Sequence, residues 1–365
     1  MKLSKMIYIE KDIENHPETL EIVSASNTKI KVIKDTAKLF KQISTASDPI
    51  EAGKKILLLS QNKGPFLKKC PGTKNYLCCG YKILHLASFC TMDCSYCILQ
   101  AYFHPPLLRY FVNTQDMEKE LDTLFAEKKI YRIGTGEFSD SLIFEKHTNI
   151  SARLTEKFGK QNHCVLELKT KTVNIKNQLR LNHNRKTIMS WSLNTEKVIN
   201  TEERGTASLE ARLNAAAQCE KQGYPLAFHF DPVIIYKDCE QDYKEVITRL
   251  FKSVSKDNIV WISIGTFRYI PTLKNIIENR FKNSKIIYGE FIKGLDNKMR
   301  YFKPIRIEFY KKIIDYIKQI APNVLIYFCM EDEQAWQKSF GFTPEQRGGL
   351  SAMLDKSAKR ICNLQ

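Results

Sequence analysis

Short hydrophobic runs alternate with amphipathic segments through the middle of the chain, at a spacing of about thirty residues. The runs have the composition of buried strands and cover residues 82–87, 130–134, 164–168, 187–193, 226–230 and 259–264. Segments with a helical pattern follow them at residues 116–128, 150–158, 173–179, 208–222, 240–254 and 272–281. Six successive strand–helix units predict an α/β fold with a parallel sheet and right-handed crossovers.

The pattern changes on both sides of this repeat. Upstream, it predicts two short strands and a helix at residues 6–10, 56–60 and 37–43. Downstream, it predicts a basic hairpin, a helix and a short strand at residues 288–304, 306–320 and 324–328, before a helical end. We therefore expect an N-terminal α/β region, a central repeat and a C-terminal hairpin and helix extension, at residues 1–80, 81–283 and 284–365.

The composition is that of a globular chain. Hydrophobic residues make up 43% and charged residues 27% of the 365 residues, as in soluble domains. No apolar run approaches the ~20 residues of a membrane span, and the first residues lack the apolar core of a signal peptide. We expect a cytoplasmic monomer with no membrane partner. Eleven cysteines in such a chain indicate metal ligands and free thiols rather than disulfides.

The chain is strongly basic, with a formal net charge of +17. This excess favours a polyanionic partner such as nucleic acid. A general enrichment in Lys, Ile and Asn is an alternative origin of the charge, so charge alone does not identify the partner.

Three cysteines follow the first hydrophobic run at the spacing CxxxCxxC: Cys90, Cys94 and Cys97. Three thiolates on one short loop can bind three irons of a cubane cluster and leave the fourth iron open to another ligand. S-adenosylmethionine (SAM) can fill that position through its amino and carboxylate groups. The alternatives are three unconnected thiols or part of a zinc site, although zinc sites favour paired CxxC motifs and this chain has one.

Polar motifs stand where the predicted strands end. Gly134, Thr135, Gly136 and Glu137 follow the second strand, and His229 and Asp231 end the fifth. Functional groups of βα barrels lie at this face. His229 and Asp231 alternate along a strand and therefore share a face, where they are either substrate contacts or structural residues.

The cysteine loop and the segments around it, at residues 63–73, 76–81 and 94–102, resemble the spore photoproduct lyase family of the radical SAM superfamily, in particular its lyase-like branch. The resemblance implies a partial (βα)6 radical SAM barrel. It also implies a [4Fe-4S] cluster, SAM, a deoxyadenosyl radical and an electron donor such as flavodoxin or ferredoxin. The substrate that it implies is a pyrimidine lesion in DNA.

Individual roles also follow from this resemblance. Residues matching the family's SAM contacts are Gly134, Thr135, Gly136, Ser139, Asp140, Lys171 and Ser192, with Lys169 as the alternative to Lys171. In the hairpin, Arg300 and Tyr301 match a pair that wedges into damaged DNA, with Lys298 beside them, and we expect them on an exposed loop. In the segment 202–217, Thr206 is expected to cap a helix, and Arg212 to pair with Glu203.

The chain departs from the lyase pattern at two positions. Glu137 stands where those lyases have the cysteine that donates hydrogen to the product radical, and a carboxylate cannot donate a hydrogen atom. Tyr96 is kept, but Ile98 replaces the second tyrosine. The catalytic candidates are Tyr96, Cys164 and Glu137, of which Tyr96 and Cys164 are possible substitute donors. The sequence does not choose among the other possible donors, which are Tyr102, Cys70, Cys78 and Cys79.

The sequence is compatible with three functions. The first is a radical SAM lyase that repairs or modifies a pyrimidine lesion in DNA. The second is a radical SAM enzyme with another substrate, which the missing donor cysteine motivates. The third is a nucleic-acid-binding protein with a structural iron–sulfur cluster. Three roles are also open for Cys70, Cys78 and Cys79. They are ligands of a second metal, redox-active thiols or packed free cysteines.

Overall fold

The computed structural model describes residues 4–72 and 75–365. Its largest sheet has the strand order β18-β14-β13-β11-β10-β9-β5-β4. All pairs from β5 to β18 are parallel, and β4 is antiparallel to β5 at one edge. The bounds are β4 Leu67–Lys69, β5 Lys82–Leu84, β9 Tyr131–Gly134, β10 Cys164–Thr170, β11 Thr187–Ser192, β13 Leu226–Val233, β14 Ile259–Thr266 and β18 Ile326–Phe328.

This sheet confirms the predicted α/β fold with a curled, parallel partial barrel. Every predicted strand of the repeat forms. The barrel is one strand larger than predicted, because β18 pairs in parallel with β14 through Ile262 and Ile326. The segment 324–328 was expected outside the repeat and instead extends its sheet.

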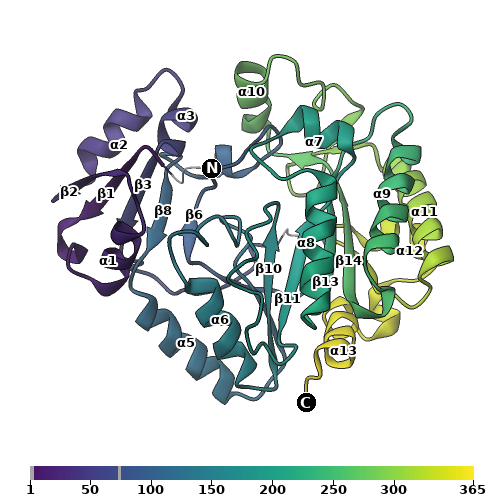
Figure 1. Ribbon diagram of the computed structural model, residues 1–365. Coiled ribbons are helices and arrows are strands. Elements are labelled where there is room, and N and C mark those ends of the chain that lie inside the picture. Colours follow the sequence, from purple (N-terminus) through teal and green to yellow (C-terminus); the bar gives the residue numbers. More distant parts are fainter. Residues whose placement is uncertain (1–3, 73–74) are drawn as a thin grey trace.

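Helices pack around the sheet (Figure 1). The longer ones are α5 Thr114–Ala126, α6 Ile150–Gly159, α8 Leu209–Lys221, α9 Cys239–Ser253, α10 Pro271–Arg280, α11 Lys303–Ile320 and α13 Leu350–Cys362. Shorter ones are α4 Leu99–Tyr102, α7 Glu196–Glu202 and α12 Glu333–Phe340, with 3-10 turns η2 Lys256–Asn258 and η3 Pro344–Arg347.

The helix predicted at residues 173–179 does not form, and turns occupy the segment. The side-chain amides of Asn174 and Asn177 donate to the carbonyls of Leu142 and Glu145 at 3.0 and 2.8 Å. Such side-chain bonds to backbone groups compete with a helix, so the prediction from hydrophobic spacing was wrong here.

A second sheet lies beside the barrel, with the order β2-β1-β3-β8-β6 (Figure 1). Its strands are β1 Met6–Glu10, β2 Lys29–Ile33, β3 Ile56–Ser60, β6 Ala87–Ser88 and β8 Leu108–Phe111, and its helices are η1 Lys11–Ile13, α1 Pro17–Ser24, α2 Ala37–Ser44 and α3 Pro49–Lys54. The predicted N-terminal strands and helix are confirmed. The sheet takes strands from both sides of residue 80, and the domain division expected there stays a prediction.

The predicted hairpin is confirmed as β16 Phe291–Lys293 and β17 Met299–Tyr301, and β17 also pairs with β15 Arg268–Tyr269. The shortest sheet joins β7 Asp93–Cys94 to β12 Glu203–Arg204. In residues 4–72 and 75–365, no helix is both long and apolar enough to cross a membrane.

Gly134 has a packing role at the end of β9. The partly buried Tyr81 side chain crosses this position and donates a hydrogen bond from its hydroxyl to Glu167 at 2.8 Å. A Cβ atom at residue 134 would lie 1.6 Å from the Tyr81 hydroxyl oxygen. Only glycine therefore lets the tyrosine reach its partner across the strand.

We expect Gly134→Ala to lower the free energy of unfolding by about 2–3 kcal/mol, because the added methyl group overpacks a rigid aromatic contact. Gly64→Ala is the matched control, since the nearest atom to its Cβ is Asn62 Oδ1 at 3.9 Å. Urea unfolding of both variants measures the difference. Equal stabilities would show that Tyr81 does not depend on Gly134.

Candidate active site

The carboxyl ends of the parallel strands surround a cavity of about 330 Å³. The cysteine loop, the ends of β10, β11, β13 and β14, and the segment after β18 all contribute to its walls. A cavity of this volume has the size of a small-molecule site, and its position is the one that βα barrels use for catalysis.

The thiols of Cys90, Cys94 and Cys97 line this one cavity. Two backbone hydrogen bonds fix the loop that carries them. Phe89 N–H donates to the Phe138 carbonyl at 2.8 Å, and Ser95 N–H donates to the Glu202 carbonyl at 2.9 Å. The loop is thereby attached to the ends of two different βα units, so its three thiols are directed inward together.

The electrostatics of these thiols fit a cationic ligand. Burial, with the Asp140 carboxylate nearby, raises the pKa of Cys90 to about 12. Burial also raises the pKa of Cys94 well above its usual value. The surrounding protein thus does not stabilise the thiolates, and a bound metal centre would have to do so. In the described part of the chain, no group of three or more His, Cys, Asp or Glu residues is arranged to hold a metal ion.

Ser139 supplies an unsatisfied polar atom to the cavity. Its side chain is 6% exposed, and its hydroxyl has no hydrogen-bond partner within residues 4–72 and 75–365. Buried hydroxyls are normally paired, and an unpaired one costs free energy. Because Ser139 lines the cavity, a ligand with a polar group can provide the missing partner.

Asp140 holds the loop after β9 against the end of β10. Its carboxylate accepts hydrogen bonds from the Leu142 and Lys171 amides at 2.9 and 2.8 Å and from the Thr170 hydroxyl at 2.8 Å. Burial raises the pKa of this carboxyl in spite of these donors. Asp140 therefore positions Lys171, whose ammonium lies 5.7 Å from the Tyr96 ring centre.

Glu137 and Lys169 form an ion pair within the cavity wall. Gly136 permits this arrangement, because a Cβ at that residue would lie 2.9 Å from Lys169 Cβ. Burial alone would lower the pKa of Lys169, but Glu137 and Glu167 raise it. Lys169 is thus occupied by acidic partners, and Lys171 is the lysine next to the cysteine loop.

Tyr96 belongs to a buried chain of polar groups. Its hydroxyl donates to Glu203, which also forms an ion pair with Arg212 at 2.5 Å, as expected. Burial raises the pKa of Tyr96 well above its usual value, and Glu203 adds to this. Thr206 was wrongly expected to cap α8, since Ser208 caps it while Thr206 accepts from Arg212 at 2.9 Å.

A second network forms the cavity floor around Glu167. The carboxylate accepts from His229 Nε2 at 2.7 Å and from Tyr81 at 2.8 Å, and His229 Nδ1 contacts the Ser263 hydroxyl at 2.6 Å. Burial opposes ionisation of Glu167, but His229 and these hydrogen bonds lower its pKa to about 2. The floor is therefore a fixed anion with donors around it.

Several predicted residues lie elsewhere. Thr135 is buried and bonds Ser141 at 2.7 Å. Cys164 starts β10 and donates to the Lys129 carbonyl at 3.8 Å, roughly 20 Å along the strand from Thr170 at the cavity. Tyr102 and Cys78 are exposed. The cavity lining includes Gly136, Ser139, Asp140, Lys171, Ser192, Lys298, Cys70 and Cys79 but none of these four, nor Gly134.

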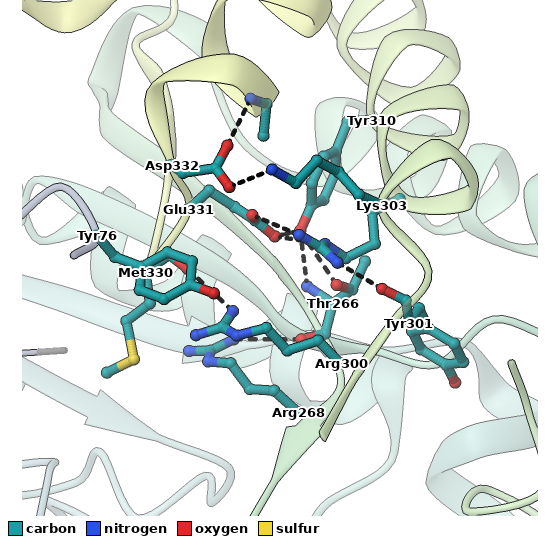
Figure 2. A network of polar contacts seen from close by, with 12 residues as sticks. Tyr76, Thr266, Arg268, Arg300, Tyr301, Lys303, Tyr310, Met330, Glu331 and Asp332 are labelled. Atoms are coloured by element: carbon teal, nitrogen blue, oxygen red, sulfur yellow. Dashed lines mark hydrogen bonds and ion pairs between the residues drawn. The ribbon is translucent and has the colours of Figure 1, made fainter. Parts of the chain in front are cut away.

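The exposed position expected for Arg300 and Tyr301 is wrong. Arg300 is 2% and Tyr301 3% exposed. Arg300 pairs with Asp296 at 2.8 Å. It also donates to the Met330 carbonyl at 3.0 Å and stacks over Tyr76 (Figure 2). The basic arm of the hairpin thus packs inward. Any contact of these residues with nucleic acid stays a prediction.

Cys329 and Arg268 are cavity residues that sequence reasoning missed. Arg268 pairs with Asp231 through two contacts of 3.1 Å and donates to Cys329 Sγ at 3.7 Å. Cys329 follows β18 directly. Its position directly after a strand could have identified it as a cavity residue. This strand was predicted to lie outside the barrel, and Cys329 was therefore missed.

A model of the spore photoproduct lyase family matches residues 67–318, more than half of the chain. The spore photoproduct lyase of Bacillus subtilis is 28% identical over 209 residues, which cover 56% of this chain and 61% of that protein. The one of Clostridium acetobutylicum is 26% identical over 254 residues, covering 69% of this chain and 71% of that protein. The chain thus matches less than two thirds of the Bacillus relative's length.

A solved structure of a spore photoproduct lyase mutant, with bound AdoMet and dinucleoside spore photoproduct, superposes with a TM-score of 0.79. It is 23% identical and covers 90% of this chain and 99% of that chain. At this identity the likeness shows a common fold. Together with the match over residues 67–318, it establishes that the chain belongs to the spore photoproduct lyase family.

Proposed function

We propose that this protein is a radical SAM enzyme that repairs or modifies a pyrimidine lesion in DNA. The observation that carries the proposal is a single cavity that contains three inward-facing cysteines, the unpaired Ser139 hydroxyl and Lys171. Family membership and the dinucleoside spore photoproduct bound by the related solved structure support the substrate.

Cys90, Cys94 and Cys97 would bind a [4Fe-4S] cluster, and Gly136, Ser139, Lys171 and Ser192 would contact SAM. When bound, the two groups supply one-electron reductive cleavage and a deoxyadenosyl radical. Lys171 carries the positive charge that suits a carboxylate. The Ser139 hydroxyl suits a polar group of the ligand. Glu203 and Arg212 keep Tyr96 in place beside the cysteine loop.

The net charge of +17 supports contact with a DNA backbone. Lys298, in the cavity wall, would carry part of this contact. The electron would come from a low-potential carrier such as a flavodoxin or a ferredoxin. Eleven cysteines suit a reducing cytoplasm, where we place the reaction.

A second candidate is a radical SAM reaction on a substrate other than damaged DNA. The Glu137–Lys169 ion pair favours it, because these charged groups occupy the cavity wall at the position of the lyases' donor cysteine. The two candidates share the cofactors and differ in the substrate, so one product assay separates them.

The deciding assay uses the anaerobically reconstituted protein with SAM, dithionite and DNA that carries the spore photoproduct. We expect chromatography to show restored thymine together with deoxyadenosine. Deoxyadenosine without thymine would contradict the DNA substrate and favour the second candidate. The absence of both products from a protein with a full cluster would contradict radical SAM chemistry.

Cys94→Ala should remove the cluster absorbance and lower deoxyadenosine formation by at least about a hundredfold, because two thiolates cannot hold the site. Cys78→Ser is the control, since Cys78 is exposed and lies outside the cavity lining. Iron analysis, visible spectra and product chromatography measure both variants. A Cys94→Ala protein with normal SAM cleavage would end the proposal.

Ser139→Ala should weaken SAM binding about five- to tenfold, which corresponds to one lost hydrogen bond of about 1 kcal/mol. The melting temperature of the ligand-free protein should not fall, because the Ser139 hydroxyl has no partner there within the described residues. Equilibrium dialysis with SAM and thermal melts test the two expectations separately. Unchanged SAM affinity would remove Ser139 from the proposed site.

A further inference from the structure

Three thiols outside the cysteine loop also line the cavity: Cys70, Cys79 and Cys329. Cys70 and Cys79 precede β5, and Cys329 follows β18, at the other edge of the parallel strands. The curl of the sheet brings these two edges together. Leu77 N–H donates a hydrogen bond across them to the Glu331 carbonyl at 3.1 Å. The three thiols therefore lie on the part of the cavity wall where the two edges of the barrel come together.

The segment that carries Cys329 is held firmly (Figure 2). Arg300 donates to the Met330 carbonyl at 3.0 Å, and the buried Glu331 carboxylate pairs with Arg306 at 2.9 Å. Lys303 pairs with Asp332 at 2.7 Å. Three successive residues after Cys329 are therefore fixed by cations from the hairpin and from α11.

The Cys329 side chain has one hydrogen-bond contact in the described part of the chain, from Arg268 Nη2 to its sulfur at 3.7 Å. The guanidinium is in turn fixed by its two contacts of 3.1 Å with Asp231. Gly265 makes room for this pair, since a Cβ there would lie 2.8 Å from Arg268 Nη1. The sulfur accepts this bond, which does not use its own hydrogen, and the residue lines the cavity.

Cys329 remains a thiol near neutral pH. Burial raises its pKa, and the Asp231 carboxylate adds to this, while Arg268 opposes it. A protonated thiol carries a weakly bound hydrogen atom, which a thiolate lacks. The cavity therefore combines cysteines placed for a metal centre with a cysteine held in the hydrogen-bearing form.

We propose that Cys329 is the catalytic residue that donates the hydrogen atom to the product radical. The inference rests on the proposed function and supplies the donor that Glu137 cannot be. The Cys329 S–H bond breaks, a C–H bond forms on the product, and a thiyl radical remains on Cys329. One electron from the low-potential carrier that reduces the cluster, with one proton from water, restores the thiol.

The other thiols are less suited to this step. Cys164 opens β10, at the opposite end of that strand from the cavity. Cys70 and Cys79 lie in the segment that precedes β5, and among the described residues no side-chain donor fixes either sulfur as Arg268 fixes that of Cys329. Cys329 also lies beyond residue 318, where the family match ends, so the family pattern does not assign it.

A labelling experiment tests the position of Cys329 without turnover. The reconstituted protein is treated anaerobically with N-ethylmaleimide, with and without SAM and the dinucleoside spore photoproduct, and its peptides are analysed by mass spectrometry. We expect the ligands to slow modification of Cys329 at least about fivefold at saturating concentration. The exposed Cys78 should react equally in both samples. Equal labelling of Cys329 would overturn the proposal, whether or not repair occurs.

Turnover in D₂O tests the donation itself. Cys329→Ser should keep deoxyadenosine formation within about twofold but lower thymine formation at least about tenfold, with loss of the solvent deuterium carried into the product. Cys78→Ser, the matched control at an exposed thiol outside the cavity lining, should keep both. If Cys329→Ser forms thymine in normal yield and with solvent deuterium, the assignment of Cys329 is overturned and the proposed function is not. Failure of the unmodified protein to form deoxyadenosine would instead overturn the proposed function.

Discussion

The buried ion pair between Arg306 and Glu331 is the interaction on which the cavity depends. Glu331 is 1% exposed, and its carboxylate accepts from Arg306 at 2.9 and 3.1 Å and from Tyr310 at 2.8 Å. Its main-chain carbonyl accepts from Leu77. One residue thus anchors α11 with its side chain and joins the two edges of the curled sheet with its backbone. Removing one partner of such a pair costs about 3–5 kcal/mol, because the other charge stays buried.

The cavity places opposite demands on its cysteines. A metal centre needs thiolates, whereas hydrogen-atom donation needs a thiol. Burial favours the protonated form at both Cys90 and Cys329. The two kinds of cysteine therefore differ in the groups that can contact their sulfur atoms. Cys90, Cys94 and Cys97 share one loop, on which a single ligand can contact all three, while Cys329 stands on a separate segment beside Arg268.

Sequence reasoning succeeded where local patterns determine the structure. The strands of the repeat follow from hydrophobic runs, and the grouping of Cys90, Cys94 and Cys97 follows from their short spacing. It failed where tertiary packing decides. Arg300 was predicted to be exposed because it is basic. It is buried because it pairs with Asp296, four positions earlier, and stacks on the Tyr76 ring.

The pairing of Arg268 with Cys329 was beyond sequence reasoning for a related reason. The two residues are 61 positions apart, and only the addition of β18 to the barrel places them side by side. Ser139 shows a further limit. The sequence identified the residue, but its lack of a partner is visible only once every neighbouring group has a position.

The strand β18 and the Glu331 anchor lie beyond residue 318, where the match to the family ends. The segment that the family model matches therefore ends before the strand that completes the barrel. The residues that close the barrel thus lie outside the matched segment, whereas the cysteine loop lies inside it. A substitution at Cys329 would thus change one wall of the cavity without altering any residue of the segment by which the family is detected.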